Sequence, residues 1–295
     1  MWLIYALGGG WGHLTRAAAL ARAAVGVQVR IITNSPHATA VGAQLPEASL
    51  RIINPAASKQ EARAIVEEEL SAAPSRFIVD AFARGLGGEL AELLPPVAAP
   101  KVLIHRDVNP RYAARIRDFA QAHYTLILAP GEGEAFPSAV RTAPWLVRSH
   151  AELPVSSRQG VFVCASGRPD EAAWYREAAA QVRRAGVPVR ESSGEWPAIQ
   201  HIAESAAVIG GGGYNTVYEC QALGAPLIAR AWPRQYDRQA LRIARAGATP
   251  VDTPQQAAAA ALEALARGPA QPPRPFPNGA QEAAALIARA NVRKS

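Results

Sequence analysis

Residues 206–219 read AAVIGGGGYNTVYE and contain the most informative pattern of the chain. The apolar residues 206–209 are typical of a short buried strand, four glycines follow, and the residues from Tyr214 onward predict a helix. Glycine permits positive φ and lets the backbone approach a ligand closely. The first turn of a helix offers unpaired N–H groups and a partial positive charge, which together favour phosphate. The stretch therefore predicts a strand, a turn and a helix that bind a phosphate group, with a tight turn that binds no ligand as the alternative.

The same alternation of short apolar runs and longer helical patterns extends along most of the chain. Alternating strands and helices predict an α/β fold in which parallel strands are joined by helical crossovers. Continuous apolar strands such as WLIYAL at residues 2–7 suit a sheet that is covered on both faces. We expect strands at residues 2–7, 27–33, 50–54, 77–80, 102–105, 125–129, 160–165, 187–191, 207–209 and 226–229. We expect helices at residues 14–24, 36–44, 60–71, 86–94, 111–123, 170–185, 199–203, 214–223, 236–246, 254–266 and 280–291.

Two interruptions divide this pattern into domains. A length of 295 residues suits two domains, because single domains of about 100–200 residues are common. Residues 130–154 lack periodicity, and residues 268–279 (GPAQPPRPFPNG) are a proline-rich linker. The sequence therefore predicts an N-terminal Rossmann-like domain over residues 1–150, a second over residues 155–270, and a C-terminal helix within residues 280–295. In such doubly wound sheets, ligands bind beyond the carboxyl ends of the strands.

The composition limits the classes of partner. The chain has a net charge of +7, and 49% of its residues are hydrophobic. A basic surface suits nucleic acid, an anionic membrane or phosphorylated ligands. Without a dense Lys/Arg run or an aromatic-basic module, nucleic-acid binding is not expected. The two cysteines, Cys164 and Cys220, lack metal spacing, and we see neither a leader peptide nor a membrane span. We expect a cytoplasmic protein, with peripheral contact at the inner membrane face left open.

Residues 210–248, GGGGYNTVYECQALGAPLIARAWPRQYDRQALRIARAGA, extend the glycine run into a longer signature. The stretch resembles the donor-binding signature of the GT-B glycosyltransferases, in the glycosyltransferase family 28 / UDP-glycosyltransferase superfamily. It is similar to the C-terminal domain of the peptidoglycan N-acetylglucosaminyltransferase group. It also resembles the plant secondary-product glycosyltransferase box, which has a glycine-aromatic-Asn-Ser/Thr core, a Glu four residues after the Asn, Gly-x-Pro and a late Asp/Glu-Gln.

The resemblance implies that residues 1–150 form the acceptor domain, that residues 155–270 form the nucleotide-sugar donor domain, and that the helix within residues 280–295 packs back on the N-terminal domain. It also implies a role for each matching residue. Glu219 would bind the ribose hydroxyls, while Asp237 and Gln239 would bind hydroxyls of the donor sugar. About two extra residues before Asp237 leave Gln235 as a rival for the sugar contact. Trp196 lies where the plant box has a base-stacking Trp, although core packing explains it equally well. The diphosphate would be held by Gly211, Gly212, Gly213, Asn215 and Thr216.

A second motif, GGGWGHLTR, occupies residues 8–16 after the first expected strand. It resembles the N-terminal Gly-x-Gly-His-x-x-Arg loop of several GT-B branches and of the related nucleotide-sugar hydrolase of pseudaminic acid synthesis. The resemblance implies that Gly12 belongs to a loop facing the donor across a central cleft. His13 would act as a base, since its ordinary pKa near 6.5 suits neutral pH; a helix-capping histidine is the alternative. Arg16 would contact a phosphate or an acceptor carboxylate, or would be solvated.

Three further polar residues lie at the carboxyl ends of expected strands of the N-terminal domain. Asp80 ends the strand 77–80 and would orient His13 as a carboxylate does in a catalytic triad; an acid that caps a helix or lies in a turn is the alternative. Arg106 and Asp107 follow the strand 102–105. They either line the acceptor site or form a structural ion pair.

These features together predict a hexosyltransferase-type enzyme. A sugar would pass from a nucleotide-diphosphate sugar, which we expect to be UDP-linked, to an acceptor hydroxyl, with His13 as the general base. The acceptor would be a small molecule, a glycan or a lipid-linked compound. The sequence has no Asp-x-Asp motif, so we expect no metal and no cofactor besides the donor substrate. A nucleotide-sugar hydrolase and a non-catalytic nucleotide-sugar-binding protein are the alternatives.

Overall fold

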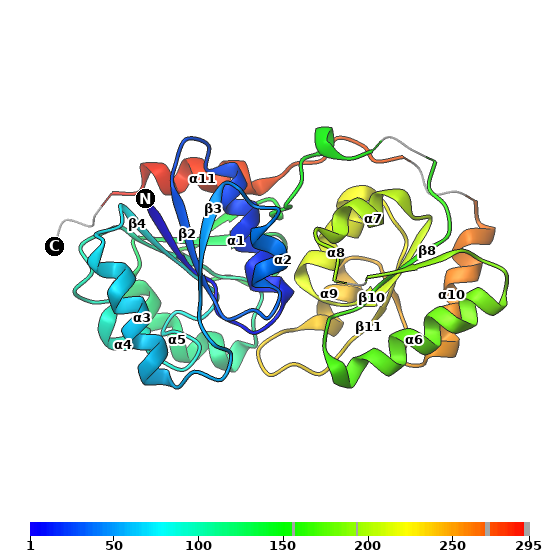
Figure 1. Ribbon diagram of the computed structural model, residues 1–295, viewed down its shortest axis with the longest axis horizontal. Coiled ribbons are helices and arrows are strands. Elements are labelled where there is room, and N and C mark those ends of the chain that lie inside the picture. The colour runs from blue at the N-terminus through cyan, green and yellow to red at the C-terminus, as the bar shows by residue number, and fades with distance from the viewer. Residues whose placement is uncertain (155–156, 193, 269–271, 292–295) are drawn as a thin grey trace. The chain divides into compact units, whose positions relative to one another are not determined.

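The structure is a computed structural model that describes residues 1–154, 157–192, 194–268 and 272–291 (Figure 1). Internal contacts divide the chain into two compact units, Met1–Trp145 with Asn278–Ser295, and Leu146–Pro277. The start of the predicted second domain at residues 155–156, part of the predicted linker and the last four residues of the predicted C-terminal segment lie outside the described residues.

The first unit contains a seven-stranded sheet in the order β3-β2-β1-β4-β5-β6-β7, and every pair of neighbours is parallel. This order is that of a doubly wound dinucleotide-binding sheet, with its reversal between β1 and β4. Its strands are β1 (Trp2–Tyr5), β2 (Val29–Thr33), β3 (Ala48–Ile52), β4 (Arg76–Asp80), β5 (Lys101–Ile104), β6 (Leu126–Pro130) and β7 (Val140–Thr142).

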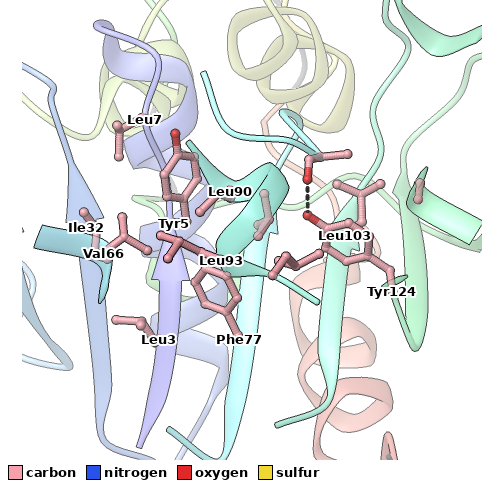
Figure 2. Packing of buried hydrophobic residues seen from close by; sticks show 14 of the residues in the cluster. Leu3, Tyr5, Leu7, Ile32, Val66, Phe77, Leu90, Leu93, Leu103 and Tyr124 are labelled. Carbon is pink, nitrogen blue, oxygen red and sulfur yellow. Dashed lines mark hydrogen bonds between the residues drawn. The ribbon is translucent and has the colours of Figure 1, made fainter. Parts of the chain in front are cut away.

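One core cluster of this unit packs strand residues against α3 (Lys59–Ser71), α4 (Leu90–Leu93) and α5 (Pro110–His123). Leu3 and Tyr5 of β1 belong to this cluster together with Phe77 of β4 (Figure 2), and all three are fully buried. The hydroxyl group of Tyr124 donates to the carbonyl oxygen of Ala83 at 2.7 Å, which fixes the loop that follows β4. The helices are α1 (Trp11–Ala23), α2 (Ala38–Gly42), α3 (Lys59–Ser71), α4 (Leu90–Leu93) and α5 (Pro110–His123).

Local sequence explains where several of these helices begin. Ser58 and Glu61 form a capping box at the start of α3, and Asn109 caps α5, whose first residue is proline. The expected helix at residues 86–94 is shortened to α4. Gly85 and Gly88 have φ of +86° and +84°, so the chain turns there before the helix begins.

The second unit contains a five-stranded sheet in the order β12-β11-β10-β8-β9, again parallel throughout. Its order reverses between β10 and β8. Its strands are β8 (Val161–Cys164), β9 (Val189–Glu191), β10 (Ala207–Gly211), β11 (Leu227–Arg230) and β12 (Thr249–Pro250). Its helices are η1 (His150–Glu152), α6 (Pro169–Arg184), α7 (Ala198–Glu204), α8 (Tyr214–Leu223), α9 (Gln239–Arg245) and α10 (Pro254–Ala266).

The last helix, α11 (Gly279–Arg289), packs on the first unit against α1, as the sequence predicts. The Gly279 N–H donates to the carbonyl oxygen of Pro144 at 3.0 Å. At the other end, the Arg76 guanidinium donates to the carbonyl oxygens of Ile287 and Ala288 at 2.8 and 2.7 Å. Among the described residues, no helix combines the length and apolarity that crossing a bilayer requires.

Candidate active-site residues

The reversal of strand order in the first unit places two sequence motifs side by side. β1 and β4 are neighbours in the sheet, and Tyr5 pairs with Val79. The glycine-rich loop before α1 leaves the carboxyl end of β1, and Asp80 ends β4. Ligands of doubly wound sheets bind at this type of reversal. This arrangement explains why His13 and Asp80, which are 67 positions apart in the sequence, are in contact.

His13, Asp80 and Arg16 form a buried, hydrogen-bonded group. The Nδ1 atom of His13 lies 2.9 Å from the Oδ2 atom of Asp80, and the carboxylate is fully buried. The Arg16 guanidinium donates to Asp80 Oδ2 at 2.6 Å and to Oδ1 at 3.1 Å. Since Arg16 is only 1% exposed, the solvated alternative is wrong for it. The His13 side chain does not cap α1, whose N-cap residue is Gly10, and it bonds instead to Asp80.

The charges in this group favour a neutral imidazole. Burial lowers the pKa of His13 from its usual value, Asp80 opposes that effect, and the positive charges of Arg16 and Arg106 add to it. Burial alone would raise the pKa of Asp80, but Arg16 and then His13 hold it well below its usual range. A neutral His13 that donates through Nδ1 to Asp80 keeps Nε2 as a proton acceptor.

Glycine is required at one position beside the His13 ring. A Cβ atom on Gly8 would lie 2.1 Å from Cδ2 and 2.4 Å from Nε2 of His13, whereas nothing lies within 4 Å of a Cβ on Gly10 or Gly12. The N–H groups of Gly8 and Gly9 both donate to Asn34 Oδ1, at 2.8 and 3.0 Å. The sequence analysis did not single out Asn34. Its position directly after β2, at the carboxyl end of a parallel strand, could have indicated a site residue.

The turn after Asp80 contains backbone strain. Ala81 has φ of +69°, a left-handed conformation that is unfavourable for alanine by about 1–2 kcal/mol. Its N–H donates to the carbonyl oxygen of Ile104 at 3.0 Å, which helps to hold the turn. Strained residues of this kind concentrate at functional sites.

The predicted acceptor-lining residues Arg106 and Asp107 follow β5. Asp107 is buried, and a Cβ atom on Gly133 would lie 2.6 Å from its Cβ, so the loop after β6 packs directly on it. The neighbouring His105 ring stacks on Phe136 with ring centroids 3.9 Å apart, and burial lowers its pKa to about 4. Arg106 is close enough to His13 to affect its pKa.

In the second unit, the glycine run forms the predicted turn between β10 and α8, and Gly213 is the residue before the helix. None of these four glycines, all described, has a positive φ. A Cβ on Gly212 would lie 2.8 Å from Ile243 and 2.9 Å from Gln239, whereas a Cβ on Gly213 would meet nothing within 4 Å. Packing therefore explains Gly212, and the open surface at Gly213 leaves room for a ligand.

Polar groups from α8 lie beside this turn. The Oγ1 atom of Thr216 lies 3.8 Å from the Sγ atom of Cys164, at the end of β8. Glu219 is 3% exposed, and its carboxyl group makes no hydrogen bond to any residue that the structure describes. Burial raises its pKa to about 8, so the carboxyl group is mainly protonated at neutral pH.

The predicted sugar-binding residues belong to the segment between β11 and α9. Asp237 accepts from Arg242 at 2.7 Å, and the Oε1 atom of Gln239 accepts from the N–H of Trp232 at 2.9 Å. Arg242 also donates to the carbonyl oxygen of Gly212 at 2.7 Å, which joins this segment to the glycine turn. Sequence reasoning missed Arg242, because arginines on helices are usually solvated.

Two predicted site residues lie outside these contacts. Gln235 is exposed on the same segment. Trp196 is 5% exposed and precedes α7, which favours core packing over base stacking.

Comparison with solved structures identifies the fold. The structure is similar to the glycotransferase of kitacinnamycin, with 14% identity, 98% of both chains covered and a TM-score of 0.62. It is similar to the glycosyltransferase SnogD from Streptomyces nogalater, with 15% identity over 99% of this chain and 100% of that one, and a TM-score of 0.59. The spinosyn rhamnosyltransferase SpnG complexed with thymidine diphosphate matches with 18% identity over 98% of this chain and 95% of that one, at a TM-score of 0.59.

No family model matches the sequence, and no curated protein matches it either. The structural likeness covers nearly all of each chain and includes both sheets. The chain therefore has the GT-B fold of these glycosyltransferases.

Proposed function

We propose that this protein transfers a sugar from a nucleotide-diphosphate sugar to an acceptor hydroxyl group. The observation that carries the proposal is the start of α8. An open helix N-terminus at Gly213 is followed, within the same helix, by the buried carboxyl group of Glu219. The N–H groups would bind the diphosphate. The carboxyl group of Glu219, which lacks a hydrogen-bond partner among the described residues, would bind a ribose hydroxyl.

The chemical step would be a single displacement. His13 Nε2 takes the proton from the acceptor hydroxyl, and the acceptor oxygen forms a bond to the anomeric carbon. The bond from that carbon to the diphosphate oxygen breaks, and the electron pair leaves with the nucleoside diphosphate. A positioned base contributes about 10²–10⁴ in rate. Fixed donors such as the first N–H groups of α8 stabilise the charge that develops on the leaving group.

Asp80 and Arg16 would act through His13. Asp80 holds the imidazole in the form that leaves Nε2 free, and it stabilises the imidazolium that forms when the proton is taken. Arg16 fixes both carboxylate oxygens of Asp80. Arg106 and Asp107 would line the acceptor site, with the acceptor itself a small molecule, a glycan or a lipid-linked compound.

The donor nucleotide is the first property to test. The sequence resemblance favours a uridine nucleotide, whereas SpnG was solved with thymidine diphosphate. Titration calorimetry with UDP and thymidine diphosphate should therefore give binding to at least one of them. Gly213→Val should weaken that binding, because its side chain would occupy the open space at the helix start. Unchanged affinity in a folded Gly213→Val variant would contradict the phosphate site.

The base is tested by His13→Ala. We expect turnover of nucleotide sugar to fall about 10²–10⁴-fold with nucleoside diphosphate affinity unchanged. His123→Ala, in the same unit, is the matched control and should keep full turnover. Full turnover in His13→Ala would show that His13 is not the base.

A further inference from the structure

Arg16 lies in the second turn of α1, three residues after His13, and its side chain is directed into the first unit. The residue is only 1% exposed, and arginine is almost never buried so completely unless it is paired. The sequence resemblance gives this arginine a ligand phosphate or an acceptor carboxylate as its partner. In the structure its guanidinium bonds to a carboxylate of the protein, that of Asp80.

Three donors converge on the Asp80 carboxylate. Its Oδ2 atom accepts from Arg16 Nη2 at 2.6 Å and from His13 Nδ1 at 2.9 Å, while its Oδ1 atom accepts from Arg16 Nε at 3.1 Å. Arg16 Nη2 lies 3.5 Å from His13 Nδ1, so the two donors approach the same oxygen side by side. Arg16 therefore shares with His13 the oxygen that the carboxylate of a catalytic triad offers to its histidine.

Packing holds the His13 ring in this arrangement. A Cβ atom on Gly8 would lie 2.1 Å from Cδ2 of the ring, and the Phe82 ring stacks on the imidazole with centroids 5.3 Å apart. The ring therefore keeps Nδ1 directed at Asp80 and leaves Nε2 as the nitrogen for a substrate proton.

The charges of this group balance only while His13 is neutral. The side chains of Asp80 and Arg16 are 0% and 1% exposed, so water does not solvate either charge. One carboxylate and one guanidinium cancel. A proton on His13 would add an uncancelled positive charge beside the guanidinium, and buried charge without a counter-charge is unfavourable.

Loss of Arg16 would reverse this balance. Among the described side chains, His13 would then be the one remaining hydrogen-bond partner of the buried Asp80 carboxylate. A carboxylate in contact with an imidazole favours the protonated form of the ring. His13 would take up a proton to neutralise Asp80 and could no longer act as a base. Arg16 supplies the positive charge that His13 would otherwise have to supply.

The other influences on His13 agree with this count of charges. Burial, the largest of them, lowers the pKa of His13, and Asp80 raises it. Arg16 and then Arg106 lower it further. These charged groups come from β4, from α1 and from the segment after β5, and their combined effect is a pKa below the usual 6.5.

We propose that Arg16 is a positioning residue that balances the charge of Asp80 and so keeps His13 neutral, and able to accept a proton, into the acid range. The inference rests on the proposed function for the role of His13 as base, and it deepens that function. The arginine of the N-terminal motif then acts on the base itself and sets the lowest pH at which the protein works.

The direct test is an NMR titration of the His13 imidazole in protein labelled at its histidine carbons, with the His13→Ala spectrum to identify the signal. In the wild type the midpoint should lie below 6.5. In Arg16→Gln it should rise by about 1–3 pH units, the range over which one neighbouring charge moves a pKa. Arg16→Lys keeps the positive charge and should stay closer to the wild type than Arg16→Gln does.

Further variants separate charge from packing. Arg22→Gln makes the same change on the same helix, where Arg22 pairs with Glu47, and should leave the midpoint unchanged. Arg16→Gln combined with Asp80→Asn removes both charges and should have a lower midpoint than Arg16→Gln alone. Melting curves show which variants fold. If Arg16→Gln alone does not fold, Asp80→Asn is compared with the double variant, which should have the higher midpoint because it lacks the guanidinium.

The pH profile of nucleoside diphosphate release tests the consequence for activity. The fall of kcat/KM at low pH reports the base of the free enzyme. In Arg16→Gln this fall should lie about 1–3 pH units higher than in the wild type, while affinity for the nucleoside diphosphate stays the same.

The outcomes keep this inference apart from the proposed function. An equal midpoint in the wild type and Arg16→Gln, or equal shifts in Arg16→Gln and Arg16→Lys, would overturn the inference whether or not the protein transfers sugar. A shifted midpoint with an unmoved pH profile would overturn the link between His13 and turnover on which the inference rests. Absence of diphosphate release by the wild type at every pH would overturn the proposed function.

Discussion

Gly8 is the residue whose substitution should affect His13 most directly. An added Cβ would lie 2.1 Å from the imidazole, so Gly8→Ala must displace the ring. We expect Gly8→Ala to reduce turnover nearly as far as His13→Ala, with nucleoside diphosphate affinity retained. Gly10→Ala is the matched control, since nothing lies within 4 Å of its Cβ. Equal turnover in the two glycine variants, measured in parallel, would contradict the placement of His13.

Glu219 should leave a signature in the dependence of stability on pH. Its pKa is about 8 in the fold, against an ordinary value of 4.5. The group therefore contributes its full stability below about pH 4.5, and that contribution is lost as the pH rises through 8. The amide in the Glu219→Gln variant cannot ionise, so this variant should not lose stability for this reason as the pH rises.

Melting temperatures of the wild type and Glu219→Gln, measured between pH 5 and pH 8.5, test this point. The wild type should lose stability relative to the variant as the pH rises. Glu263→Gln, an exposed position on α10, should follow the wild type. Parallel curves for the wild type and Glu219→Gln would show that the carboxyl group is not buried as described.

Within the second unit, the turn between β10 and α8 combines a tightly packed glycine, Gly212, with one that faces open space, Gly213. Gly212→Ala would press its methyl group against Ile243 and Gln239, and overpacking of this kind costs about 1–3 kcal/mol. Gly213→Ala meets open space and should leave the free energy of unfolding nearly unchanged.

Chemical denaturation and nucleotide titration should therefore separate the two variants. Gly212→Ala should unfold at lower denaturant concentration. Gly213→Ala should unfold as the wild type does but bind the nucleoside diphosphate more weakly, because the proposed diphosphate site lies at this backbone. The reverse assignment, with Gly213→Ala destabilised and Gly212→Ala unaffected, would contradict the described turn.

At the scale of the whole molecule, α11 connects the end of the chain to the first unit. Arg76→Met removes the donors to the carbonyl oxygens of Ile287 and Ala288 while keeping much of the side-chain volume. Hydrogen bonds from a charged group contribute about 1.5–3 kcal/mol each, less where water reaches them. We expect Arg76→Met to lower the free energy of unfolding by about 1–3 kcal/mol in total.

Arg63→Met is the control for that measurement. Arg63 pairs with Glu92 on the surface, and exposed pairs of this type contribute about 0–1 kcal/mol. If denaturation of the two variants coincided, the contact between Arg76 and the end of α11 would not stabilise the protein.

The sequence predicts the α/β architecture because buried strands such as β1 and β10 are continuous apolar runs flanked by glycine. It does not predict β7 or β12, because three- and two-residue edge strands carry no periodicity of their own. The contact between His13 and Asp80 can be anticipated from the sequence, because His13 follows one strand, Asp80 ends another, and the carboxyl ends of parallel strands share one edge of the sheet. The contacts of Arg242 with Gly212 and of Glu171 with Arg234 cannot be predicted from the sequence, because each joins segments that are far apart along the chain.

Sugar transfer by this protein can be measured as the release of nucleoside diphosphate from a nucleotide sugar. The wild type would be incubated with uridine and thymidine diphosphate sugars, with and without a panel of hydroxyl-bearing acceptors, while free diphosphate and acceptor mass are followed. We predict release that depends on an acceptor, together with an acceptor product heavier by one sugar residue. Release at the same rate without any acceptor, or tight donor binding with no release under any condition, would contradict the proposed sugar transfer.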